Sequence, residues 1–233
     1  MKNEPKILIL GDGLLGGEIF QQTRWDVLSR KKDSISAERI TEWASRMDSY
    51  DTLINCIANT DTYGQERDPH WKVNYEFVYN LISYCNKYNK KLVHISTDYV
   101  YSGSKRMASE EDVPVHCRNW YGYTKLLADG LVQLSCLDYL VLRCTHKPRP
   151  FPYPEAWVDQ FGNFDYVDTI ADIVVNMVRK NSSGLYNIGT DLKSIYELAK
   201  QTQANPKKIF APAHVPKNQS MNLDKFLKKC KNQ

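Results

Sequence analysis

Apolar and polar positions follow two different periods along the chain, and each period predicts a different element. Short apolar runs that end in glycine or small polar residues predict buried strands, whereas apolar residues spaced by three and four positions predict helices. On this basis we predict strands at residues 6–10, 25–33, 51–59, 92–96, 139–143, 156–161 and 184–189. We predict helices that open within residues 11–22 and that span residues 69–88, 120–135, 165–179, 194–203 and 223–231.

Strands and helices alternate along most of the chain, which is typical of an α/β protein whose strands pair in parallel. We therefore predict a Rossmann-like, doubly wound parallel sheet with a small C-terminal substrate-binding portion. The predicted dinucleotide-binding domain spans residues 1–147, and residues 165–188 return to it. The predicted small portion comprises residues 148–164 and 189–233.

The composition is ordinary for a globular protein, with 42% hydrophobic and 25% charged residues. The formal net charge of +4 is modest, so we expect no nucleic-acid partner. No apolar run approaches the roughly 20 residues of a membrane span, and the N-terminus lacks the apolar core of a signal peptide. We expect a cytoplasmic protein with no membrane partner. The six cysteines show neither a C-x-x-C pair nor a zinc spacing, so we expect no metal site.

A glycine-rich loop follows the first predicted strand. Gly11, Gly13 and Gly16 fit the G-x-G-x-x-G spacing that opens a helix in dinucleotide-binding proteins. The first glycine allows a tight turn, the second lets a pyrophosphate approach the backbone, and the third allows close helix packing. Leu14 and Leu15 belong to the same predicted cofactor loop. Structural glycines without a ligand are the alternative interpretation.

The second predicted strand ends in Ser29, Arg30 and Lys31, where proteins that use NAD usually carry an acidic residue for the ribose. A hydroxyl and two cations suit a 2′-phosphate, so we predict that NADPH is preferred over NADH. The alternative is a solvated basic turn. The third predicted strand ends in small or polar residues that leave room for the cofactor, namely Cys56, Ala58, Asn59 and Thr60. Cys56, Ile57 and Ala58 are assigned to the predicted cofactor site.

The strand "LVHIS" at residues 92–96 leads directly to Thr97 and Asp98. Tyr121 and Lys125 lie four positions apart in a predicted helix, so they share one face. We predict that Lys125 lowers the pKa of the Tyr121 phenol and that Thr97 holds a substrate carbonyl. Two other Tyr-x-x-x-Lys spacings occur, at Tyr101 and Tyr196, so a surface Tyr and Lys on a helix is the alternative interpretation.

Two further features suggest roles near this site. Asn74 lies in the apolar stripe of the helix predicted at residues 69–88 and is either an internally bonded helix residue or part of a proton relay. The Pro-rich segment His146–Trp157 is predicted to form an open wall of the substrate cleft. Its side chains for a base, a sugar or a diphosphate are Lys147, Arg149, Phe151, Tyr153 and Trp157. The alternative is a hydrophobic clasp or a partner surface.

With these residues identified, the chain resembles the extended short-chain dehydrogenase/reductases and, within them, the dTDP-4-dehydrorhamnose reductase family. The blocks "STDYVYSG" and "YGYTK" carry the resemblance, which runs through most of the chain. It implies that Thr97, Tyr121 and Lys125 are catalytic, that Asn74 joins a relay, and that Lys125 also bonds the nicotinamide ribose. The implied reaction is NADPH-dependent reduction of a 4-keto-6-deoxy sugar nucleotide, with hydride delivered to the ketone carbon and a proton from Tyr121.

Two departures from the family leave other functions open. The segment after "RCTHK" is shorter than usual, and His146 stands where the family tends to have tryptophan. A non-catalytic NADP-binding subunit, similar to the β subunit of methionine adenosyltransferase, is the second hypothesis. A 3,5-epimerase/4-reductase is the third, although Tyr99 replaces the cysteine of that class. The predicted substrate-binding residues are Thr97, Asp98, Tyr99, His146, Lys147 and Arg149, and a homodimer is left open.

Overall fold

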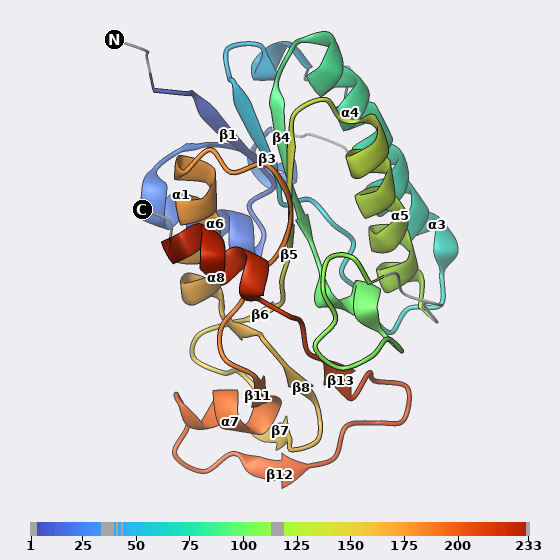
Figure 1. Ribbon diagram of the computed structural model, residues 1–233, viewed down its shortest axis with the longest axis vertical. Helices are drawn as coiled ribbons and strands as arrows, with labels where there is room; N and C mark the ends of the chain where they lie inside the picture. Colours follow the sequence, from blue (N-terminus) through green and yellow to red (C-terminus); the bar gives the residue numbers. More distant parts are fainter. Residues whose placement is uncertain (1–3, 34–39, 41, 43, 113–118, 232–233) are drawn as a thin grey trace.

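The computed structural model describes residues 4–33, 40, 42, 44–112 and 119–231. Its centre is a six-stranded parallel sheet in the order β10-β5-β4-β3-β1-β2 (Figure 1). The strands are β1 (Ile7–Leu10), β2 (Asp26–Leu28), β3 (Thr52–Asn55), β4 (Lys91–Ser96), β5 (Tyr139–Arg143) and β10 (Gly184–Asn187). The chain passes from β1 to β2 and then returns to the other side of β1 with β3. Such a reversal makes a crevice at the carboxyl ends of the strands, where open α/β sheets bind ligands.

Helices cover both faces of this sheet (Figure 1). One face carries α1 (Leu14–Thr23), α6 (Val167–Arg179) and α8 (Asp224–Lys231), and the other carries α3 (Arg67–His70), α4 (Phe77–Lys87) and α5 (Trp120–Ser135). In β1, Ile7 and Ile9 pack with α1 and α6, whereas Leu8 and Leu10 pack with α4 and α5. Successive side chains of a strand point to opposite faces, so a strand that is apolar throughout needs cover on both sides. The predicted Rossmann-like, doubly wound fold is confirmed.

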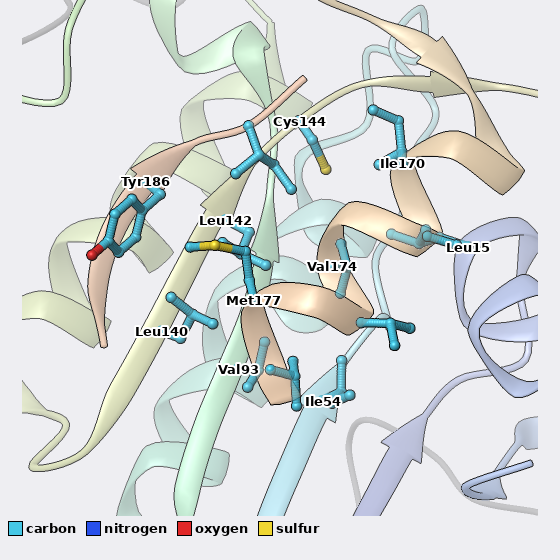
Figure 2. Close-up of a cluster of buried hydrophobic side chains, with 14 of the residues drawn as sticks. Leu15, Ile54, Val93, Leu140, Leu142, Cys144, Ile170, Val174, Met177 and Tyr186 are labelled. Carbon is cyan, nitrogen blue, oxygen red and sulfur yellow. The ribbon is translucent and has the colours of Figure 1, made fainter. Parts of the chain in front are cut away.

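Figure 2 shows the core between α6 and the sheet. Leu15 of α1 and Val174 and Met177 of α6 share one cluster with Ile54 and Leu140 of the strands, and each of these side chains is at most 5% exposed. Burying an aliphatic side chain of this size stabilises a fold by roughly 1.5 to 3 kcal/mol. The cluster therefore holds α1, and the loop that precedes it, firmly against the sheet.

A smaller part of the chain lies beyond the carboxyl edge of the large sheet (Figure 1). It is built from short pairings of β6 (His146–Lys147) with β9 (Asp165–Tyr166), β7 (Glu155–Trp157) with β12 (Lys207–Ile209), and β8 (Phe161–Gly162) with β11 (Lys193–Ser194) and β13 (Asn218–Gln219). Helix α7 (Ile195–Lys200) joins them through a core of its own that includes Phe151, Phe164 and Tyr166. Helix α8, which we expected in the small portion, packs instead beside β10, with Phe226 in the large core.

Three predicted strands were wrong in extent. The strand predicted at residues 51–59 is β3, which ends at Asn55. The strand predicted at residues 25–33 ends at Leu28, and a short helix, α2 (Arg30–Asp33), follows it. The strand predicted at residues 156–161 is divided between β7 and β8, because the Asp159 carboxylate between them accepts the Ala211 N–H at 2.7 Å and turns the chain toward another partner.

Smaller differences occur in the helices. The helix predicted at residues 69–88 is α3, a π-helical turn η3 (Trp71–Glu76) and α4 in succession, and α6 begins at Val167 because the preceding residues form β9. The short 3₁₀ turns are η2 (Ala44–Met47) and η4 (Asp98–Tyr101). Within the described part of the chain, no helix has both the length and the apolar character that a bilayer crossing requires.

Candidate active site

A cleft of about 570 Å³ lies at the carboxyl edge of the large sheet, between it and the small portion. Three groups of segments line it: the loop after β1, the ends of β3 and β4 with the start of α5, and the chain from β5 into the small portion. Its lining includes Gly13, Leu14, Leu15, Cys56, Ala58, Thr97, Tyr99, Tyr121, Lys125, His146 and Lys147. Most residues that we predicted from the sequence therefore converge on one cavity.

The glycine loop has the close contacts that its spacing predicts. Gly11 has φ of +97°, and a Cβ there would lie 3.0 Å from Ile57 Cγ1. A Cβ on Gly16 would lie 2.0 Å from the Gly11 carbonyl oxygen, so only glycine lets α1 start this close to the loop. Gly13 has open space around it and lacks a side-chain cap for α1. Gly11, Gly16 and Ile57 therefore support the cleft, while Gly13 and its neighbours line it.

The turn after β2 holds an acidic residue that the sequence reasoning did not consider. Asp33 accepts the Ser29 N–H at 2.8 Å and pairs with Arg46. Burial raises the pKa of Asp33, but the Ser29 N–H and Arg46 outweigh it, so the net pKa lies below the usual value. Ser29 is buried, whereas Arg30 and Lys31 are exposed. Arg30 and Lys31 thus lie exposed beside a carboxylate that is already paired with Arg46. The preference for NADPH stays a prediction.

Thr97 and Tyr121 lie together in the cleft. Thr97 Oγ1 caps the turn η4 by accepting the Tyr99 N–H at 3.2 Å. Burial raises the pKa of the Tyr121 phenol, and its hydrogen bond with Thr97 opposes this without reversing it. The prediction of a lowered phenol pKa was wrong, because burial and the nearby Asp98 carboxyl both favour the neutral phenol. The phenol keeps its proton at neutral pH and can donate it.

Lys125 is buried, with 2% of its surface exposed. Its Nζ donates to Ile95 O at 2.6 Å and lies 3.1 Å from His94 Nε2. Burial lowers the pKa of Lys125 to about 8, although Asp129, one turn along α5, favours the charged form. Helix α5 is fixed at its start by the Asn119 side chain, which accepts the Gly122 N–H at 2.7 Å.

Asn74 lies in the π-helical turn η3 and is fully engaged in internal hydrogen bonds. Its Oδ1 accepts the Asn59 N–H at 2.8 Å, and its Nδ2 donates to Asn59 O at 3.0 Å and to Thr124 Oγ1 at 3.1 Å. These bonds tie the loop after β3 to helix α5. Asn74 is thus an internally hydrogen-bonded helix residue, as one of the two interpretations expected, and its role in a proton relay stays a prediction.

The chain after β5 brings only some of the predicted substrate residues to the cleft. His146, Lys147, Tyr153 and Trp157 line it, and burial lowers the pKa of His146 to about 4, so its ring is neutral. Arg149 does not line it. Its guanidinium pairs with Asp168 at 2.9 Å and stacks over the Tyr166 ring at 4.2 Å. Phe151 is only 3% exposed and belongs to the core of the small portion.

Asp98 supports the cleft from behind. Its Oδ1 accepts from Thr145 Oγ1 at 2.6 Å and from Gln219 Nε2 at 3.1 Å, and burial raises its pKa to about 6. Gln219 also accepts from Gln160 Nε2 at 2.8 Å. Asp98 therefore links β4 to the small portion and anchors the far wall of the cleft.

Sequence reasoning did not single out several residues of this region, among them Tyr63, His94, Gln160 and Gln219. Tyr63 lies in the polar loop after β3, which carries no distinctive pattern. Gln219 lies in β13, a strand of only two residues that no alternation in the sequence reveals. His94 had the clearest signal, since a histidine interrupts the apolar run of a buried strand.

A family model and several known proteins are similar to this chain. A family model described as the RmlD substrate binding domain matches residues 5–146, more than half of the chain. The spore coat polysaccharide biosynthesis protein SpsK of Bacillus subtilis is 27% identical over 173 residues, which cover 71% of this chain and 57% of that protein. The dTDP-4-dehydrorhamnose reductase of Escherichia coli is 24% identical over 216 residues, covering 76% of this chain and 72% of that one.

A solved structure has the same fold over nearly the whole chain. The dTDP-4-dehydrorhamnose reductase of Bacillus anthracis, in complex with NADP, has a TM-score of 0.82 at 20% identity and covers 97% of this chain and 93% of that one. The chain spans little more than half the length of SpsK. At this identity the structural likeness establishes the fold and not the activity.

Proposed function

The chain belongs to the RmlD substrate binding domain family, and from this premise we propose that it is an NADPH-dependent reductase of a keto-sugar nucleotide, similar to dTDP-4-dehydrorhamnose reductase. The observation that carries the proposal is the convergence of Thr97, Tyr121 and Lys125 with the glycine loop in one cleft. A hydroxyl pair next to a buried lysine, open to a dinucleotide loop, suits the reduction of a carbonyl group.

The residues of the loop fit a dinucleotide. The first turn of α1 has no side-chain cap at Gly13, and nothing lies within 4 Å of the Cβ position of that residue. Helix N-termini of this kind favour phosphate groups, because their N–H groups and the helix dipole face the ligand. Leu14 and Leu15 continue the same surface. NADPH supplies a hydride when it is bound, and the relative from Bacillus anthracis was solved with NADP.

In the proposed mechanism, three side chains bind the substrate ketone oxygen or assist its protonation. Thr97 donates a hydrogen bond to the ketone and orients it beside Tyr121. The neutral Tyr121 phenol gives up its proton as negative charge develops on that oxygen, and the Lys125 side chain stabilises the resulting phenolate. A positioned proton donor of this kind contributes roughly a hundredfold to ten-thousandfold in rate.

We propose a sugar nucleotide as substrate because of the wall that faces Tyr121. Tyr153 and Trp157 line the cleft, and so does Lys147, whose pKa is lowered by burial and raised again in part by the nearby Asp98. Aromatic rings suit a base or a sugar face, and the ammonium suits a phosphate. Tyr99 lines the same region, with its ring 5.5 Å from that of Tyr121.

The experiment that tests the proposal is a screen of nucleotide sugars for thermal stabilisation with NADPH present, followed by measurement of NADPH oxidation with each compound that stabilises the protein. A reductase oxidises NADPH only when the ketone is added. Stable NADPH binding without oxidation by any keto-sugar nucleotide would favour the non-catalytic subunit hypothesis. The shortened segment after "RCTHK" is the physical argument for that hypothesis.

A further inference from the structure

His94 is a buried histidine in the middle of β4, and it contacts the lysine of the proposed catalytic set. The side chain is 0% exposed. Its Nε2 lies 3.1 Å from Lys125 Nζ, and its Nδ1 lies 3.2 Å from Asn55 Nδ2. None of the steps proposed above uses this ring.

The neighbouring amide determines where the ring carries its proton. Asn55 Oδ1 accepts the Ile57 N–H at 3.0 Å, so the NH₂ group of Asn55 must face His94 Nδ1. A donor at that position makes Nδ1 the acceptor, and a neutral imidazole then carries its hydrogen on Nε2. The ring is neutral because burial, and then the charge of Lys125, hold the pKa of His94 well below its usual value.

The Nε2–H of His94 consequently points toward Lys125 Nζ. An ammonium group has three donors and no acceptor, so in its presence two donors would face each other at 3.1 Å. A neutral amine can accept the Nε2–H with its lone pair while it still donates to Ile95 O at 2.6 Å. The contact therefore favours the neutral form of Lys125.

Other groups around Lys125 also affect the equilibrium between its ammonium and amine forms. Asp129 favours the ammonium. Its Oδ1 lies 3.9 Å from His94 Nε2 and has no hydrogen-bond partner within the described residues, while its Oδ2 accepts from Arg143 Nε at 2.9 Å. The remaining titratable groups that face this region are Tyr121, Cys56 and Cys144. Burial raises the pKa of both thiols to about 12, so they are neutral at physiological pH.

We propose that His94 is a positioning residue for Lys125, whose Nε2–H disfavours the ammonium form and keeps the lysine able to exchange a proton near neutral pH. His94 and Asp129 are both sealed from solvent at 0% exposure, so they set the charge of Lys125 and do not carry protons to water. The effect of His94 on turnover rests on the proposed reductase function, whereas its effect on the protonation of Lys125 does not.

The test measures the titration of Lys125 by NMR in protein with labelled lysine side chains, with the Lys125→Met spectrum for assignment. In His94→Gln, an amide carbonyl near the former Nε2 position can accept from the ammonium. We expect the Lys125 titration to move up by about one pH unit, a tenfold change in the proton equilibrium. Cys85→Ala, a buried change elsewhere in the core, should leave the titration unchanged. An unchanged titration in His94→Gln would overturn the proposal.

Two further measurements keep the proposal testable if that variant does not fold. His94→Asn retains an amide near Asn55, removes the group that faces Lys125, and should also raise the titration. Nitrogen spectra of labelled histidine in the wild type should show the hydrogen of His94 on Nε2, and a hydrogen on Nδ1 would overturn the argument. If the Lys125 titration moves but no ketone is reduced, the proposed reductase function is refuted, while the effect of His94 on the protonation of Lys125 is supported. If turnover occurs, its alkaline limb should move with the titration.

Discussion

Replacing Tyr121 by Phe removes a single oxygen from the cleft and leaves the ring in place. The phenol oxygen is bonded to Thr97, and Lys125 keeps its bonds to Ile95 and His94 in the variant. The fold should therefore lose no more than the roughly 0.5 to 1.5 kcal/mol of one hydrogen bond. Turnover should fall by roughly a hundredfold to ten-thousandfold, or about 2.7 to 5.4 kcal/mol in activation free energy.

The lower end of that range is expected for Tyr121→Phe. Thr97 still donates a hydrogen bond to the ketone, so part of the stabilisation of the developing alkoxide remains. The assay is steady-state NADPH oxidation with the best ketone, together with a fluorescence titration of NADPH, whose affinity should not change.

Tyr123→Phe is the matched control. Tyr123 lies on the same helix but is 38% exposed and packs against Trp120, so its loss should leave turnover unchanged. Full turnover in Tyr121→Phe, with the control equal to wild type, would remove Tyr121 from the mechanism. Equal losses in both variants would instead indicate damage to helix α5.

Three other predictions concern the cofactor turn, the far wall and a buried acid. NADPH should bind more tightly than NADH, and Arg30→Ala should reduce that difference in a titration of both cofactors; equal affinities in the wild type would make the turn a solvated surface. Lys147→Ala should raise the substrate KM. Arg149→Ala should leave it unchanged, because the Arg149 guanidinium already pairs with Asp168 in the wild type. The opposite pattern would place the phosphate site elsewhere. Because the pKa of Asp98 is raised by burial to about 6, the folded state favours its protonated form. The stabilisation from that proton should be present below about pH 4 and be lost as the pH rises to about 6, so unfolding temperatures of Asp98→Asn should lack this decline between pH 4 and 6.

The sequence predicts well the large sheet and which residues meet at its carboxyl edge, because both depend on local patterns. The run at β1 and the spacing of Gly11, Gly13 and Gly16 identify a strand, a turn and a helix that occur together. Tyr121 and Lys125 lie on one helix, so their common face follows from the helical period. Their convergence with Thr97 follows from the parallel order of the strands.

The small portion could not be predicted in the same way. Its strands have two or three residues and pair with partners far along the chain, as β8 at Phe161 does with β13 at Asn218. No local period encodes such pairings. The direction of Arg149 depends on Asp168 in a helix that begins eighteen residues later. The raised pKa of Tyr121 depends on burial from several segments at once, which a Tyr-Lys spacing does not reveal.

The transfer of deuterium from labelled NADPH tests the central claim most directly. The wild-type protein is incubated with a 4-keto-6-deoxy sugar nucleotide and NADPH that carries deuterium at the transferable position, and the product is analysed by mass spectrometry and NMR. The proposed mechanism predicts one deuterium, bonded to C4 of the product sugar, and roughly a hundredfold less of that product from Tyr121→Phe at matched times. Binding of both ligands with no deuterium at C4 would contradict it.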